Sequence, residues 1–227
     1  MKTNLRLLWG MWRLTRLPHP AITVFGGSRI PHESIHANMA TQLAKMLAAD
    51  GFSIITGGGP GIMEAANKGA FEYLKECRLN GGRECPRGEI SAGVSLVRLN
   101  TTEHENPYVQ EFVEMRHFFA RKWLLVRYST GFVVFPGGFG TMDELFEIIN
   151  LVQCNRMAKV PIVLIDKSYW APLTEWIDHR ALPYHMIEPE DAKIIKITDS
   201  IEEAFSIMHD GCKNRLTSPT YDGMDKA

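Results

Sequence analysis

Hydrophobic positions along the chain follow two alternating patterns. Short apolar runs, typical of buried strands, separate longer segments whose apolar residues recur at helical spacing. The runs expected to form strands are 21–25, 53–56, 91–97, 131–135, 161–165 and, as a short last strand, 193–197. The segments expected to form helices are 34–49, 62–76, 111–128, 141–152, 172–178 and 201–208. This alternation predicts an α/β fold: a single-domain, Rossmann-like, doubly wound parallel sheet with helices on both faces.

The two ends of the chain differ from this core domain, which is expected at 21–210. Residues 1–20 form a basic, amphipathic segment, and residues 211–227 form a polar tail. The N-terminal segment is either a membrane-surface helix or a helix that packs on the body or on a partner subunit. The second interpretation is preferred, because the segment is short and its two tryptophans offer a large area for burial. Residues 78–89 are expected to be a surface loop.

Composition and charge exclude several classes of protein. The 227 residues carry a net charge of -1, which provides no overall attraction to nucleic acid or to a membrane, so neither partner is expected. No apolar stretch approaches the roughly 20 residues needed to span a bilayer. The four cysteines contain no C-x-x-C pair, so a zinc site is not expected. They are interpreted as reduced thiols in the cytoplasm, with a Cys77–Cys85 disulfide as the alternative.

Glycine-rich loops follow three of the expected strands, at residues 26–28, 57–61 and 136–140. The carboxyl ends of parallel strands meet at one edge of a sheet, so the three loops are expected to lie together. Glycine lets the main chain approach a ligand closely, and free N–H groups at a helix start attract anions such as phosphate. Because neither Gly-Lys-[Ser/Thr] nor a full Gly-x-Gly-x-x-Gly is present, a mononucleotide substrate is favoured over a dinucleotide cofactor.

Several polar side chains accompany these loops. Thr141 is expected to cap the helix or to donate its hydroxyl to the ligand, and Glu144 is expected in the first helical turn, facing the ligand. A helix-start acid is the plainer interpretation of Glu144. Arg121 and Lys122 lie within a very apolar helix, where charges are normally paired or face a ligand. Arg121 is the better candidate, since its planar guanidinium suits bidentate contact, whereas Lys122 is also consistent with a wet helix edge.

The segment Pro136-Gly137-Gly138-Phe139-Gly140-Thr141-Met142-Asp143-Glu144 resembles Pro-Gly-Gly-x-Gly-Thr-x-x-Glu, the signature of the Lonely Guy (LOG) family, often mislabelled as lysine decarboxylases. Residues 24–29, 56–67 and 121–122 are similar to the family's other motif blocks, in the same order. The resemblance covers roughly residues 20 to 208. It implies a Rossmann-like, oligomeric hydrolase, at least a homodimer, that cleaves the N-glycosidic bond of a nucleoside 5′-monophosphate.

The resemblance also assigns roles to residues of this chain. Arg121 and Glu144 correspond to the family's catalytic pair, with no metal or cofactor. Glu103 lies near a position at which the family often has a ligand-contacting acid. Together with the loops, the expected substrate-binding residues are Gly27, Ser28, Gly57, Gly58, Gly59, Glu103, Lys122, Gly137, Gly138, Gly140 and Thr141. His32 and His36 have the spacing of a metal pair but lack a third ligand, so they are interpreted as ordinary surface residues.

Three functions are compared on these residues. The first is a phosphoribohydrolase acting on AMP or a cytokinin riboside monophosphate. The second is a nucleotide-binding sensor or carrier on the same fold, without turnover. The third, a pyridoxal-phosphate lysine decarboxylase, is discounted, because no lysine stands out for a Schiff base. Residues 26–29 depart from the usual sequence of the family's first loop, and the loop 78–89 is longer than expected for the family. The preferred base is therefore open, and a general purine or pyrimidine nucleotide nucleosidase is also considered.

Overall fold

A computed structural model describes residues 2–18, 20–81, 85–97 and 106–213. Over these residues the strands form one sheet of seven, in the order β4-β3-β2-β1-β5-β6-β7, and every neighbouring pair is parallel. The strands are β1 (Ala21–Phe25), β2 (Ser53–Thr56), β3 (Ser91–Leu96), β4 (Glu111–Met115), β5 (Gly131–Val134), β6 (Ile162–Ile165) and β7 (Ile195–Thr198). The predicted Rossmann-like parallel sheet is confirmed.

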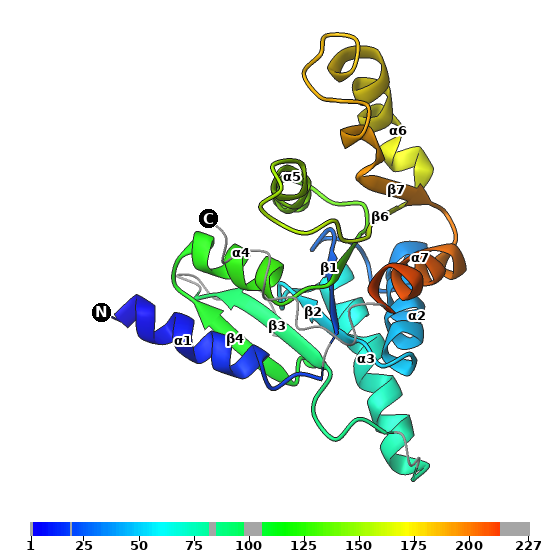
Figure 1. Ribbon diagram of the computed structural model, residues 1–227. Helices are drawn as coiled ribbons and strands as arrows, with labels where there is room; N and C mark the ends of the chain where they lie inside the picture. Colours follow the sequence, from blue (N-terminus) through cyan, green and yellow to red (C-terminus); the bar gives the residue numbers. More distant parts are fainter. Residues whose placement is uncertain (1, 19, 82–84, 98–105, 214–227) are drawn as a thin grey trace.

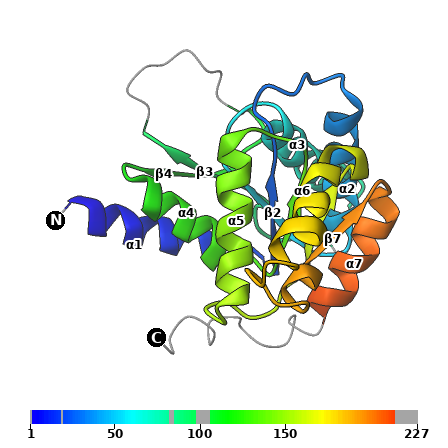
Figure 2. The ribbon, with the colours of Figure 1, turned by 90° about the horizontal axis from the view of Figure 1, so that it is seen from above.

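Helices cover both faces of the sheet (Figures 1 and 2). One layer consists of α1 (Lys2–Leu14), α4 (Phe118–Arg127), α5 (Phe139–Gln153) and α6 (Lys167–Trp176). The opposite layer consists of α2 (Ile35–Ala49), α3 (Ile62–Leu79) and α7 (Ile201–Lys213). Short π and 3-10 helices at Ile177–Ala181 and Asp191–Lys193 follow α6. Two apolar cores result, one beneath each helical layer.

The central strands are buried on both faces, which explains why they read as continuous apolar runs. In β1, Ala21 and Phe25 belong to the core under α1, α4, α5 and α6. Ile22 and Val24 of the same strand belong to the core under α2, α3 and α7. Successive strand residues point to opposite faces, so one short apolar run serves both cores.

The strand order reverses at β1, and this reversal positions the site. From β1 the chain proceeds outward to β2, β3 and β4, and then returns to place β5 on the other side of β1. β1 and β5 pair from Ile22 opposite Gly131 to Phe25 opposite Val134. The loops that leave these two strands diverge to opposite layers. A crevice at the carboxyl ends of such strands is where ligands bind in this class of sheet.

One predicted element is wrong. The single helix expected at 111–128 is in fact strand β4 followed by helix α4. Within β4 the side chains of Val113 and Met115 are buried while Phe112 and Glu114 are exposed, which is the two-residue period of a strand. His117 then adopts an extended conformation, φ -114° and ψ 136°, and α4 starts at the next residue. No glycine or proline marks the boundary between β4 and α4, so the apolar spacing of 111–128 predicted one continuous helix.

Other boundaries shift by a few residues. α5 begins at Phe139 instead of Thr141, and α6 begins at Lys167 with Pro172 inside it. α3 continues to Leu79, into the segment expected to be a loop, and residues 82–84 of that segment lie outside the described residues. α7 extends to Lys213, so it includes the start of the expected polar tail. The rest of the tail, 214–227, lies outside the described residues.

Helix α1 packs on the outer strand β4 and on α4 (Figure 1). Gly10 sits at the contact: a Cβ there would lie 2.8 Å from the Met115 side chain and 2.9 Å from Val113. The opposite side of α1 exposes Leu5, Leu8, Trp9 and Trp12. Across the part of the chain that the structure describes, no helix combines the length and apolar character required to cross a membrane.

Candidate active site

The three glycine loops meet at the carboxyl edge of the sheet and are hydrogen-bonded to one another. The Gly27 N–H donates to the Pro136 carbonyl at 2.9 Å, and the Ile62 N–H donates to the Gly27 carbonyl at 3.2 Å. Gly61 has φ +69°, and a Cβ there would lie 2.4 Å from the Gly27 carbonyl oxygen. Only glycine satisfies both constraints, so Gly61 fixes how closely the loops after β1 and β2 approach.

The loop after β5 leads directly into α5. Gly138 is the N-cap residue, and around both Gly138 and Gly140 an added Cβ would meet no atom within 4 Å. The first N–H groups of a helix have no partner within the helix, and the helix dipole adds partial positive charge. This open, glycine-lined helix start is therefore suited to bind a phosphate.

Thr141 and Glu144 lie further into α5 than the sequence suggested. The expected capping role of Thr141 is wrong, because Gly138 occupies the N-cap position without a side-chain hydrogen bond. Thr141 is buried, and its side chain packs against Gly137, where a Cβ would lie 2.7 Å from the Thr141 Cβ. Glu144 falls in the second turn, not the first, so the plainer interpretation as a helix-start acid loses its basis.

Arg121 reaches the site from the first turn of α4. Its Nε–H donates to the carbonyl of Val94 in β3 at 3.0 Å, and its Nη1 donates to Glu144 Oε1 at 2.9 Å. The guanidinium also lies against Gly57, where a Cβ would come within 2.2 Å of Arg121 Nη2. Gly57 therefore makes room for the guanidinium, a role different from close approach to phosphate.

The Arg121–Glu144 pair is largely withdrawn from solvent. The two side chains are 13% and 12% exposed. Burial raises the pKa of Glu144 above its ordinary value, although the adjacent Arg121 charge and hydrogen bond act in the opposite direction. The result is a carboxyl group whose pKa lies above that of an exposed glutamate, as suits an acid–base group.

Lys122 points to different partners from its neighbour Arg121. Its ammonium lies 3.0 Å from Asp143 and 2.9 Å from Glu147, both on α5. Burial opposes its charge, but the hydrogen bonds to Glu147 and Asp143 outweigh that effect and raise its pKa. These contacts join α4 to α5. That Lys122 also contacts the substrate stays a prediction.

Two other predicted binding residues lie elsewhere. Ser28 is exposed next to Gly27, and Glu103 lies outside the described residues.

A buried polar network behind the loop after β2 was missed by the sequence reasoning. Thr56 Oγ1 accepts the Gly58 N–H at 3.0 Å and donates to Asn67 Oδ1 at 2.6 Å. Asn106 donates to the same oxygen at 3.0 Å and to the Gly59 carbonyl at 3.3 Å. The network holds the loop in place. Asn67 gave a signal, because an asparagine between buried alanines of a helix needs partners.

The histidines at 32 and 36 also differ from expectation. His36 is not an ordinary surface residue: its Nε2 lies 2.9 Å from Asp166 Oδ2, and both side chains are mostly buried. His32 is exposed, 3.8 Å from Glu64. Within the described ranges, no group of three or more His, Cys, Asp or Glu side chains is placed to hold a metal ion. All four cysteines are free thiols.

The fold and the site together define a Rossmann-like α/β protein with a glycine-lined helix start beside a buried Arg–Glu pair. The chain belongs to the family described as "Possible lysine decarboxylase", the LOG family, whose model matches residues 63–208. The matched range contains Arg121, Glu144 and the loop after β5, and it begins just after the loop that follows β2. This match supports, independently, the family resemblance that the sequence motifs indicated.

The related proteins are distant in sequence. The chain is 29% identical over 182 residues to the probable cytokinin riboside 5′-monophosphate phosphoribohydrolase LOGL2 of Oryza sativa subsp. japonica, covering 80% of this chain and 69% of that protein. It is 27% identical over 190 residues to LOG1 of Arabidopsis thaliana, a cytokinin riboside 5′-monophosphate phosphoribohydrolase, covering 83% and 82%. It is 29% identical over 146 residues to the pyrimidine/purine nucleotide 5′-monophosphate nucleosidase of Escherichia coli, covering 62% and 31%.

Solved structures agree on the fold. The molybdenum cofactor binding protein of Rippkaea orientalis superposes with a TM-score of 0.58 at 19% identity, over 87% of this chain and 98% of that one. The Moco carrier protein of Chlamydomonas reinhardtii gives a TM-score of 0.52 at 20% identity, over 87% and 96%. At these identities the likeness establishes a shared architecture and nothing about the ligand.

Proposed function

We propose that this protein is a phosphoribohydrolase that cleaves the N-glycosidic bond of a nucleoside 5′-monophosphate, AMP or a cytokinin riboside monophosphate, without a metal or cofactor. The observation that carries the proposal is the buried Arg121–Glu144 pair, 2.9 Å apart, beside the glycine-lined start of α5. The named activities of the relatives agree with it. The products are the free base and ribose 5-phosphate, so one water is consumed.

Each group has a chemical task in this reaction. The N–H groups at the start of α5 hold the phosphate, and that binding positions the distant glycosidic bond. The bond breaks with its electrons going to the base, which leaves positive charge on the ribosyl ring. Ionised Glu144 stabilises that charge and accepts a proton from the attacking water, whose oxygen bonds to the ribosyl carbon; this proton then passes to the departing base, which leaves Glu144 ionised again. Arg121 cannot act as a base. It orients the Glu144 carboxylate through its own anchor on Val94.

The phosphate requirement is directly testable. AMP is expected to be cleaved at least about a hundredfold more efficiently than adenosine, since hydrogen bonds to a charged group contribute about 1.5–3 kcal/mol each and the helix start offers several. The measurement is kcat/KM for both compounds by chromatography of released adenine. Equal values for the two would contradict a phosphate-anchored site. A panel of other monophosphates in the same assay defines base preference.

A sensor or carrier without turnover is the alternative function. It fits the fold, which this chain shares with a molybdenum cofactor binding protein and with a Moco carrier protein. A carrier does not account for an acid with a raised pKa held against a buried arginine beside the glycine loops. Nucleotide binding measured by calorimetry, without release of base from any monophosphate, would favour the carrier.

We also infer a homodimer, formed through the outer surface of the layer that contains α4, α5 and α6. Exposed aromatic side chains gather there: Phe118, Phe119, Phe146 and Trp176. Two hollows flank the Lys122–Glu147 ion pair on this surface, of about 600 Å³ beside α1 and α4 and about 560 Å³ between α5 and α6. Large exposed apolar patches are rare on monomeric proteins and often mark an interface.

The assembly prediction needs two samples. Light scattering of the wild-type protein is expected to give at least twice the chain mass of 25.7 kDa. Replacing Phe119 by aspartate is expected to shift the mass toward the monomer, because a charge would be placed within the apolar contact. Replacing Met186, which is equally exposed beyond α6, by aspartate is the control and should leave the mass unchanged. A wild-type mass of one chain would refute the inference.

A further inference from the structure

Helix α6 starts beside the glycine loop that leads into α5, and the two are joined by a hydrogen bond. The Tyr169 hydroxyl, from the first turn of α6, donates to the Gly137 carbonyl. β6 pairs directly with β5, from Phe132 opposite Ile162 to Val134 opposite Leu164. The segments that leave these strands are therefore neighbours along the carboxyl edge. The loop after β5 thus lies between Gly27 on the β1 side and Tyr169 on the β6 side.

The direction of this bond determines where the next N–H group points. In a trans peptide, the carbonyl of one residue and the N–H of the next point to opposite sides. Holding the Gly137 carbonyl toward Tyr169 and β6 turns the Gly138 N–H toward β1, the side on which the Gly27 loop lies. Gly138 is the N-cap residue of α5, and the space around it is open. Its N–H is among the donors that a phosphate at this helix start would use.

We propose that Tyr169 is a positioning residue, which orients the Gly137–Gly138 peptide so that the Gly138 N–H faces the phosphate of the substrate. This inference rests on the proposed function for the identity of the ligand as a nucleoside 5′-monophosphate. It assigns Tyr169 no contact with the reacting bond.

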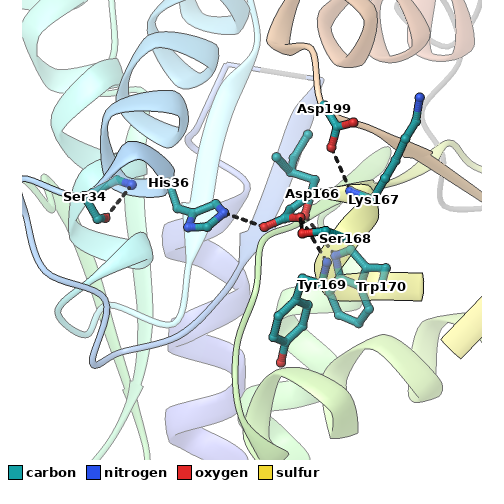
Figure 3. Close-up of polar contacts among 10 residues, drawn as sticks. Ser34, His36, Asp166, Lys167, Ser168, Tyr169, Trp170 and Asp199 are labelled. Carbon is teal, nitrogen blue, oxygen red and sulfur yellow. Dashed lines mark hydrogen bonds and ion pairs between the residues drawn. The ribbon is translucent and has the colours of Figure 1, made fainter. Parts of the chain in front are cut away.

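The start of α6 is braced so that Tyr169 has a fixed position (Figure 3). Asp166 caps the helix: its Oδ1 accepts the Tyr169 N–H at 3.0 Å and the Ser168 hydroxyl at 2.7 Å. The Lys167 N–H donates to Asp199 at 2.8 Å. Trp170 is fully buried, its Nε1–H donates to the Ile165 carbonyl at 2.9 Å, and its ring meets the Tyr169 ring edge to face. The backbone of Tyr169 is therefore held by Asp166 and its ring by Trp170.

A second brace joins α6 to the helix that follows β1. His36 lies in the first turn of α2, and its Nε2 is 2.9 Å from Asp166 Oδ2 (Figure 3). Asp166 holds φ +85° and ψ 92°, a strained conformation for a residue with a side chain. Burial opposes ionisation of Asp166, but the hydrogen bonds from Ser168, Tyr169 and His36 outweigh it and lower its pKa. The carboxylate thus stays charged and keeps all these partners around neutral pH.

The test replaces one hydroxyl. Tyr169→Phe keeps the ring and its packing and removes the bond to Gly137. We expect the dissociation constant for AMP, measured by calorimetry, to rise roughly three- to tenfold, the range for one net hydrogen bond. The dissociation constant for adenosine, which has no phosphate, is expected to stay the same, and the melting temperature should change little. Tyr184→Phe, the same substitution at an exposed tyrosine beyond α6, is the matched control and should match wild type.

The outcomes separate this inference from the proposed function. A wild-type protein that binds AMP but releases no adenine overturns the proposed hydrolase, while the binding comparison still decides the role of Tyr169. Unchanged AMP affinity in Tyr169→Phe overturns the positioning role. An equal loss of affinity for AMP and adenosine also overturns it, because a general loosening of the site would affect both ligands. If wild type binds neither AMP nor inorganic phosphate, both proposals fail.

Discussion

Glu144→Gln is expected to lower kcat for AMP cleavage by about 10²–10⁴-fold, the typical loss when a general acid–base group is removed. Glutamine keeps the size of the side chain and a hydrogen bond acceptor for Arg121, but it carries no charge and accepts no proton. The dissociation constant for AMP is expected to change by less than about threefold, because the lost interaction forms mainly in the transition state. Released-base assays and calorimetry on the same preparations measure the two quantities separately.

Asp143 offers a matched control for this experiment. It precedes Glu144 in α5, but it is paired with Lys122 at 3.0 Å and is about half exposed. Asp143→Asn removes the neighbouring charge without touching Arg121, so kcat is expected to stay within about twofold of wild type, consistent with the small energies of exposed ion pairs. If Glu144→Gln retained near-normal turnover, or if Asp143→Asn lost as much, the catalytic assignment of Glu144 would be wrong.

The same assignment fixes the direction of the pH dependence. Glu144 acts as the ionised form, and burial raises its pKa above the ordinary value of 4.5. Activity is therefore expected to fall on the acidic side at a higher pH than an exposed glutamate would give, and to increase as pH rises through that raised pKa. In Glu144→Gln this acidic limb should disappear from the residual activity.

Gly69→Ala is expected to destabilise the fold by about 3 kcal/mol, near the upper end for overpacking a core. Gly69 lies where α3 crosses α2, and a Cβ there would come within 2.1 Å of the Thr41 carbonyl oxygen and 3.0 Å of the Lys45 nitrogen. Both obstacles are backbone atoms of α2, so neither can rotate away. For a domain of this size, that loss corresponds to a decrease of roughly 6–12 °C in melting temperature, measured by calorimetry or circular dichroism.

Gly140→Ala is the control for this substitution. Both glycines lie inside helices, but an added Cβ at Gly140 meets nothing within 4 Å. Alanine is favoured over glycine in a helix by up to about 1 kcal/mol, so the melting temperature should stay the same or rise. A similar decrease in melting temperature in both variants would show that the loss of stability comes from replacing a helical glycine as such, and not from the α2–α3 contact.

The sequence predicted the parallel sheet well because buried strands have a local pattern, and the structure brings together Arg121 and Glu144, whose catalytic role stays a prediction. Short apolar runs identify strands buried on two faces, and a glycine loop between a strand and a helix predicts an anion site. The helix expected at 111–128 failed for a physical reason. β4 is an outer strand with one exposed face, so its five residues alternate in burial. In the sequence, these alternating apolar positions cannot be told apart from the apolar spacing of the helix that follows.

Contacts between segments distant in sequence were beyond such reasoning. Nothing local to Tyr169 indicates that its hydroxyl reaches Gly137, and nothing local to His36 indicates Asp166. Those contacts follow from strand order, which places β6 beside β5 and brings α2 close to the start of α6. Asp166 itself was predictable as a helix cap after an apolar strand, because aspartate is favoured at that position.

The reversal of strand order at β1 has a consequence for synthesis of the protein. As the chain leaves the ribosome, β1, β2 and β3 are available to pair with one another, while β5, the other neighbour of β1, is made more than a hundred residues after β1. Until β5 arrives, β1 presents an unpaired edge made of Ala21-Ile22-Thr23-Val24-Phe25, which is entirely buried in the finished fold. Exposed apolar edges promote association with other chains. Nascent chains that stall before β5 are therefore the species most in need of chaperone protection.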